Sequence, residues 1–195
     1  MDRENIRIVL EAARKLTNHR EYVIMGSLSI LGSIEHPPVA MAMSNDVDFY
    51  PLEDPARAGE IAKAIGQGSP FEIQHGYYAD AIRPSIAALP EGWKDRLIRY
   101  EFGTGVVAYY LNPDDAAVAK LARSEARDRR WVREGLAAGI LNAETIHHRM
   151  ETAPFLDQAE HDRAKETLSA AMKAAEASNR KLAAKGTFRK PPGND

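Results

Sequence analysis

Two carboxylates separated by one residue are the first side chains in this sequence with a clear chemical use. Asp46 and Asp48 flank Val47, and Phe49 follows. If this segment is a strand, both carboxylates lie on one face while Val47 and Phe49 face a core. Neighbouring carboxylates repel each other and lose hydration unless a cation lies between them. Because Mg²⁺ is usually held by carboxylates and substrate phosphates, the pair predicts a Mg²⁺ or Mn²⁺ site.

A second candidate site, suited to an anion, precedes the carboxylates. The apolar run 22–25 breaks at Gly26-Ser27. If Ser27 opens a helix, its hydroxyl and the first backbone N–H groups are available to a bound anion, and the helix dipole favours negative charge there. We therefore interpret Gly26 and Ser27 as a phosphate-binding turn. Each pattern alone is common in turns and solvated edges, so the hypothesis depends on their combination.

Apolar periodicity and turn residues predict the elements that would position these groups. A helix is indicated over 2–17 with Asp2 as its N-cap, and shorter helices should begin at Ser27 and after Asp54-Pro55. Strands are expected at 22–25, 46–50, 71–73, 77–82, 97–102 and 106–111. The ends of the strands 22–25 and 46–50 and the start of the Ser27 helix should face one cleft. The loop 34–44 should lie over the mouth of this cleft, where Met41 and Met43 would offer apolar surface to cover a ligand.

The pattern is helical from Asn112 onward. Asn112 should cap a helix that carries Lys120, and we interpret 120–133 as helical, with arginines paired to carboxylates at i, i+4 spacing. These arginines are Arg123, Arg127, Arg129, Arg130 and Arg133. The element order predicts an α+β fold, a mixed sheet flanked by helices with a helical C-terminal half. The expected division is an α/β core at 1–111, a helical region packed on it at 112–185 and a disordered tail at 186–195.

Composition limits the classes of protein. The chain has 195 residues, 44% hydrophobic residues, a net charge of −2 and no cysteine. These values fit a globular domain and exclude disulfides and thiolate chemistry. Since no apolar run is long enough to span a membrane and no signal core is evident, a cytoplasmic protein without a membrane partner is expected.

The order of strand, Gly26-Ser27, helix and Asp46-Val47-Asp48 resembles the DNA polymerase β-type nucleotidyltransferase superfamily. Ser27 and Asp46 are 19 residues apart, which is wider than the family usually shows, but a loop insertion costs little free energy.

From Tyr22 to about Met150 the chain is similar to small bacterial nucleotidyltransferase-like proteins of toxin–antitoxin and abortive-infection (AbiEii-type) systems. The similarity includes the segment 69–78 followed by the turn 89–93, and the helix bearing Lys120. It also includes an Arg/Lys-Asp element at Arg123, Arg127 and Asp128. Glu125 stands where that group often has arginine.

The resemblance implies transfer of a nucleoside monophosphate from an NTP to a hydroxyl of an RNA, such as tRNA, or of a protein. Asp46 and Asp48 would bind two Mg²⁺ or Mn²⁺ ions, and Asp80 would be the third catalytic carboxylate. The groups that would bind the triphosphate are Gly26, Ser27, Lys120 and Arg123. Asp80 could equally be a solvated edge residue, and Lys120 an exposed helix lysine.

Two other functions remain open from the sequence. The chain could be a catalytically silent nucleotidyltransferase fold that acts as an antitoxin-like or regulatory binding module with a cognate partner protein. It could also be a helical DNA-binding protein, although a net charge of −2 gives such binding little electrostatic support.

Overall fold

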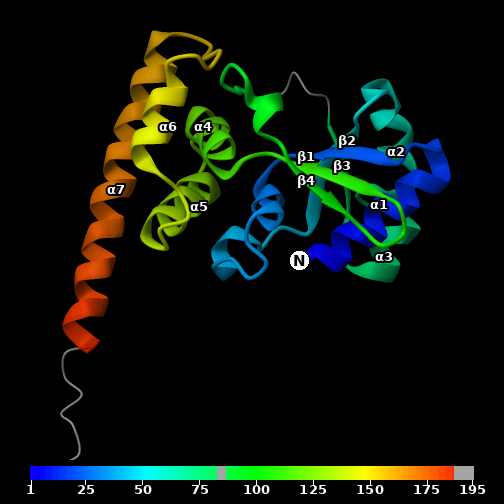
Figure 1. Cartoon of the computed structure of the whole chain (residues 1–195), viewed down its shortest axis with the longest axis horizontal. Helices are drawn as coiled ribbons and strands as arrows, with labels where there is room; N and C mark the ends of the chain where they lie inside the picture. Colours follow the sequence, from blue (N-terminus) through cyan, green and yellow to red (C-terminus); the bar gives the residue numbers. More distant parts are fainter. Residues whose placement is uncertain (83–86, 187–195) are drawn as a thin grey trace, which may run out of the picture.

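A mixed sheet organises the N-terminal part of the chain (Figure 1). The computed structural model describes residues 1–82 and 87–186. Within them the strands are β1 (Glu21–Ile24), β2 (Asp46–Pro51), β3 (Tyr78–Ala81), β4 (Ile98–Glu101) and β5 (Val107–Tyr110). Their order is β3-β2-β1-β5-β4. The β1–β2 and β4–β5 pairs are antiparallel, whereas β1–β5 and β2–β3 are parallel. The predicted α+β class and mixed sheet are confirmed.

Three helices accompany the sheet in this part of the chain: α1 (Arg3–Thr17), α2 (Ala58–Ile65) and α3 (Pro70–His75). Helix α1 has the predicted cap, since the Asp2 side chain accepts a hydrogen bond from the Asn5 backbone N–H. Its Ile6 and Leu10 are fully buried, as their helical spacing requires. The short 3₁₀ helix η3 (Pro55–Arg57) leads into α2, which packs on α1 and β3.

The expected strand at 71–73 is wrong, because these residues belong to α3. The Ser69 hydroxyl accepts a hydrogen bond from the Glu72 backbone N–H at 3.3 Å, and Pro70 occupies the first turn. Gly76 ends the helix with φ 76°. A short apolar run fits either a strand or a helix, and here the serine cap, proline and glycine decide in favour of the helix.

The segment between the Gly-Ser turn and β2 forms two 3₁₀ helices, η1 (Ser27–Gly32) and η2 (Val39–Met41). Met41 is fully buried, and its carbonyl oxygen accepts a hydrogen bond from Trp131 Nε1 at 3.1 Å. Met43 is 61% exposed. The expectation that Met41 covers the cleft is therefore wrong: η2 packs against α5 (Ala126–Ala137) instead.

The C-terminal half is helical, as predicted. It contains α4 (Pro113–Arg123), α5, α6 (Ala143–Met150) and α7 (Gln158–Gly186), preceded by the 3₁₀ helix η5 (Trp93–Arg96). Asn112 caps α4 as expected, accepting from the Asp114 backbone N–H. Helix α4 packs against α5, α6 and α7, and Figure 1 shows the long α7 along the outside of this half.

A continuous helix over 120–133 is wrong. Helix α4 ends at Ser124, whose φ of 51° is left-handed, and α5 begins after Glu125. Glu125 and Asp128 form a reciprocal capping box, which satisfies backbone donors at the new N-terminus. The chain therefore turns between α4 and α5.

A buried carboxylate ties the helical half together. Asp115 is fully buried and receives two hydrogen bonds from Arg96, at 2.9 and 3.0 Å. Arg149 Nη1 lies 3.1 Å from the same carboxylate. Removing either arginine would leave a less compensated buried charge, so this cluster holds η5 and α6 against α4.

No helix in the described part of the chain is long and apolar enough to cross a membrane. The predicted tail 186–195 lies, apart from Gly186, outside the described residues. The division into a core at 1–111 and a region at 112–185 stays a prediction.

Candidate functional site

Three carboxylates converge on one face of two neighbouring strands. Val47 and Phe49 of β2 are fully buried, so strand alternation turns Asp46 and Asp48 to the opposite face. In the adjacent strand β3, Asp80 is in register with Asp48. One oxygen from each of the three carboxylates lies within 4.8 Å of the others. The structure therefore brings together the three residues that the sequence suggested as catalytic, including the exposed edge residue Asp80.

Mutual repulsion and burial disturb the ionisation of this cluster. Burial, followed by the charges of Asp46 and Asp80, raises the pKa of Asp48 to about 7. Partial burial and Asp46 also raise the pKa of Asp80 above its usual value. Asp46 accepts a hydrogen bond from the Ser44 hydroxyl. A cation between the carboxylates would remove the repulsion that favours protonated Asp48.

The donor atoms of the cluster suit a hard divalent cation. All three donors are carboxylate oxygens, and the chain contains no cysteine. Such a set favours Mg²⁺ or Mn²⁺ over Zn²⁺, which prefers nitrogen and sulfur ligands. The cluster thus fits the predicted metal chemistry.

The Gly-Ser turn lies directly against these carboxylates. Met25 donates its backbone N–H to the Asp48 carbonyl oxygen at 2.8 Å. Gly26 has φ 60° and ψ −151°, and a Cβ added there would lie only 1.7 Å from Asp48 Oδ2. Both the backbone conformation and the close approach require glycine. Ser27 then opens η1 as predicted.

Lys120 reaches the turn from α4. Its side chain is 4% exposed, and Nζ donates to Ser27 Oγ at 2.9 Å and to Asp128 Oδ1 at 3.2 Å. Nζ also lies 5.0 Å from the centre of the Trp131 ring, an attractive cation–π geometry. Burial lowers the lysine pKa, and Asp128 opposes that shift. The alternative of an ordinary exposed helix lysine is therefore wrong.

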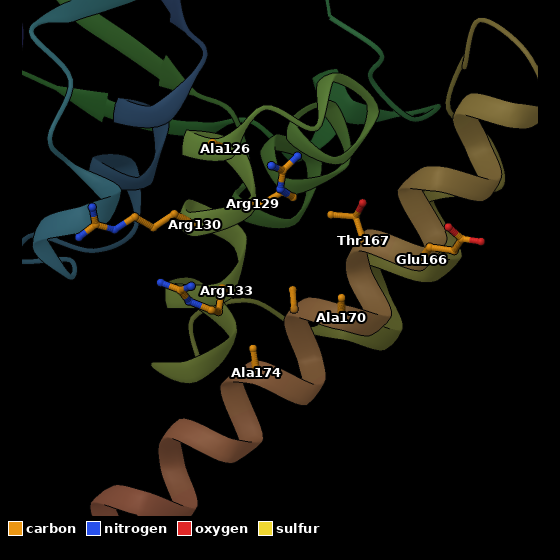
Figure 2. A pocket seen from close by; sticks show the side chains of 9 residues that line it. Ala126, Arg129, Arg130, Arg133, Glu166, Thr167, Ala170 and Ala174 are labelled. Atoms are coloured by element: carbon orange, nitrogen blue, oxygen red, sulfur yellow. The ribbon is translucent and has the colours of Figure 1, made fainter.

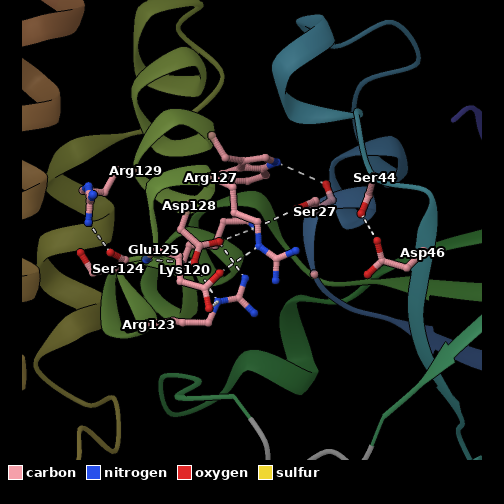
Figure 3. A network of polar contacts seen from close by, with 12 residues as sticks. Ser27, Ser44, Asp46, Lys120, Arg123, Ser124, Glu125, Arg127, Asp128 and Arg129 are labelled. Atoms are coloured by element: carbon pink, nitrogen blue, oxygen red, sulfur yellow. Dashed lines mark hydrogen bonds and ion pairs between the residues drawn. The ribbon is translucent and has the colours of Figure 1, made fainter. Parts of the chain in front are cut away.

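Asp128 organises the cationic side of the site, although sequence reasoning did not include it among the site residues. It is fully buried and accepts two hydrogen bonds of 2.7 Å from Arg123, in addition to the bond from Lys120. The side chain of Arg123 remains 48% exposed. Figure 3 shows Lys120, Arg123 and Asp128 grouped on the helical side, opposite Ser27 and Asp46. The break at Ser124, which the sequence analysis missed, lets Asp128 turn back onto α4.

Arg127 adds a further cation near the carboxylates. Its side chain is 67% exposed and its Nε donates to Glu125 at 3.1 Å. Its charge acts to lower the pKa of Asp80. Figure 3 shows Arg127 extending from α5 toward the sheet side of the site.

A cleft of about 560 Å³ lies between the ends of these side chains on the sheet and α4. Its polar lining includes Asp48, Asp80, Lys120 and Arg123, and α4 contributes a wall of small apolar side chains. Gly26 also lines the cleft, whereas residues 34–44 do not. The cleft is large enough for a small-molecule ligand, with carboxylates and cations on facing sides.

Comparison with known proteins gives one family. A family model described as "Nucleotidyltransferase of unknown function (DUF6036)" matches residues 4–180. No curated protein matches the chain significantly, and neither does any solved structure.

Proposed function

This chain belongs to that nucleotidyltransferase family, and we propose that it transfers a nucleoside monophosphate from an NTP to a hydroxyl of an RNA or protein acceptor. The observation that carries the proposal is the convergence of Asp46, Asp48 and Asp80 beside the Gly26-Ser27 turn. The acceptor oxygen would attack the α-phosphorus, the bond from that phosphorus to the β-phosphate oxygen would break, and pyrophosphate would leave.

The carboxylates would hold two Mg²⁺ or Mn²⁺ ions. When bound, such ions stabilise the attacking and leaving oxygens of an in-line displacement. Asp46 and Asp48 project side by side from β2 and would be the principal ligands. Asp80 lies beside them and would accept the proton of the acceptor hydroxyl.

The triphosphate would lie between the Gly-Ser turn and α4. Ser27 Oγ accepts its hydrogen bond from Lys120, so the hydroxyl proton remains available for a phosphate oxygen. Arg123 uses Nε and Nη2 on Asp128, which leaves Nη1 for the ligand. Lys120 donates two hydrogen bonds within the protein, to Ser27 and Asp128. Its role would therefore be to orient Ser27 and to add positive charge to the cleft wall.

Isothermal titration with each NTP, with and without Mg²⁺, tests the proposal. We expect Mg²⁺-dependent binding to the wild type and its loss when Asp46→Asn and Asp48→Asn are combined. Equal NTP binding by the wild type and the double variant would contradict the proposed site. Mg²⁺-dependent binding without pyrophosphate release, across a range of RNA and protein acceptors, would instead favour the catalytically silent module.

We also propose a cellular location and a biological role for this reaction. We place the reaction in the cytoplasm, where NTPs are abundant, and assign the protein the toxin role of a toxin–antitoxin pair with a cognate partner protein. The basis is the resemblance described above. Expression of the wild type in a bacterial host should arrest growth, whereas the Asp46→Asn variant should not. Normal growth with active wild-type enzyme would remove the toxin assignment.

A further inference from the structure

A groove between α5 and α7 lies outside the cleft just described. Its volume is about 640 Å³. From α5 it is lined by three exposed arginines, Arg129, Arg130 and Arg133, and from α7 mainly by Thr167 and small alanine side chains. Figure 2 shows Thr167, Ala170 and Ala174 on the α7 side, and Arg130 and Arg133 extending from α5 in a common direction, away from α7. The groove therefore has small side chains on its α7 wall, and its positive charge lies along its outer α5 edge.

The arginines of this groove are poorly neutralised within the protein. The expected i, i+4 pairing does not form: Glu125 pairs with Arg127 and Arg123, not with Arg129. Arg129 donates instead to the Ser124 carbonyl oxygen, and Arg130 has no ion pair among the described residues.

Two carboxylates lie close to the groove. Glu134 pairs with the third arginine, Arg133, at 2.8 Å. Glu166 lines the rim, but Figure 2 shows its side chain directed away from the arginines. Like charges three or four residues apart destabilise a helix, so this arrangement costs stability unless an anion binds there.

Helix α5 contributes residues both to the groove and to the cationic side of the candidate active site. Arg127, which acts electrostatically on Asp80, is three residues before Arg130 and therefore a neighbour on the helix surface. Arg130 in turn is three residues before Arg133. A stripe of cationic side chains thus leads from the carboxylate cluster along α5 into the groove.

We infer that this groove binds the sugar-phosphate backbone of the acceptor, and that the acceptor is therefore an RNA. The inference rests on the proposed function and specifies its acceptor. A chain of phosphates in the groove would place the terminal hydroxyl of the RNA at Asp46, Asp48 and Asp80. Arginine guanidinium groups match phosphate geometry closely, and phosphate contacts position a nucleic acid without reading its bases. Because none of the described residues that line the groove is aromatic, binding should depend weakly on sequence.

The test is fluorescence anisotropy of a labelled single-stranded RNA of mixed sequence, titrated with protein at several salt concentrations. The groove variant combines Arg129→Gln, Arg130→Gln and Arg133→Gln. We expect its affinity to fall by about tenfold or more at moderate salt. The slope of log affinity against log salt should fall in magnitude by about 2, because each lost phosphate contact on a single strand removes about 0.7.

A matched control removes three charges at the far end of the molecule, with Lys15→Gln, Arg20→Gln and Lys63→Gln, which are all exposed. This control should bind RNA like the wild type. The charge-preserving variant with lysine at the three groove positions should retain most of the affinity. Circular dichroism verifies that each variant remains helical.

Several results would overturn the inference. They are an unchanged affinity and salt slope in the groove variant, an equal loss in the far-end control, no RNA binding by the wild type, or nucleotidylation of a protein instead of RNA. NTP titration of the same proteins separates this inference from the proposed function. Loss of RNA binding with intact Mg²⁺·NTP binding supports both, whereas RNA binding at the groove without any NTP binding would contradict only the proposed function.

Discussion

Replacing Gly26 by alanine should disable the proposed metal site through a single methyl group. In the folded protein this Cβ would lie 1.7 Å from Asp48 Oδ2, a separation that non-bonded atoms cannot adopt. The carboxylate must therefore move by more than an ångström. Metal–ligand distances tolerate only about 0.2 Å, so the moved carboxylate would no longer complete the cluster with Asp46 and Asp80.

The expected loss of stability in Gly26→Ala has two parts. The backbone at Gly26, with φ 60° and ψ −151°, lies in a region essentially restricted to glycine, and an alanine there costs about 1–3 kcal/mol of folding free energy. Separately, a cation at about 100 times its dissociation constant stabilises the wild type by about 2.7 kcal/mol. The Gly26→Ala variant should lose this second, metal-dependent gain completely.

Gly76→Ala provides the matched control. Gly76 also has a positive φ of 76°, but a Cβ added there meets nothing within 4 Å. This variant should lose about 1–2 kcal/mol of stability from the left-handed backbone alone and keep the full metal-dependent gain. The assay is urea denaturation of the three proteins with Mg²⁺ and with EDTA.

An equal Mg²⁺-dependent gain in Gly26→Ala and the wild type would refute the argument that Gly26 and Asp48 are fitted to each other around a metal. If Gly76→Ala also lost the Mg²⁺-dependent gain in stability, general destabilisation would explain the result for Gly26→Ala.

Three further predictions follow from particular contacts. In EDTA, stability should fall as pH rises from about 4 to about 7, because native Asp48, whose pKa is about 7 against an ordinary 3.8, retains a proton that the unfolded chain has lost. Urea denaturation of Asp48→Asn across this range should show a flatter profile, and an unchanged profile would contradict the assignment. Asp128→Asn should cost about 3–5 kcal/mol because it leaves buried Lys120 unpaired, whereas Lys120→Met should cost less since Asp128 keeps two hydrogen bonds from Arg123; equal losses in denaturant midpoints would argue against this network. Ser69→Ala should reduce stability by about 1 kcal/mol through loss of the α3 cap, and a change near zero would show that Pro70 and Gly76 suffice for the helix.

The residues around β2 were predictable because strand alternation is a strong local rule. Buried Val47 and Phe49 force Asp46 and Asp48 to the other face. A glycine-serine break after an apolar run indicates the turn. The helix caps at Asp2 and Asn112 were predictable for the same reason, since a single side chain satisfies a local backbone group.

Contacts between distant segments were not predictable in this way. The burial of Lys120 depends on Ser27 and on Trp131, and no local pattern shows that an arginine-rich segment contains a buried aspartate at 128. The break at Ser124 needed a non-glycine residue in a left-handed conformation, which is uncommon. Met41 follows a proline loop, and its burial depends on α5, far along the chain.

The most direct test of the central claim is a transfer assay with NTP radiolabelled either at the α-phosphate or at the γ-phosphate, incubated with RNA, Mg²⁺ and the protein. The account predicts that the α-label becomes attached to RNA, that the γ-label is released as pyrophosphate, and that Asp46→Asn abolishes both. Attachment of the γ-label, or transfer that survives in Asp46→Asn, would contradict nucleotidyl transfer at this carboxylate cluster.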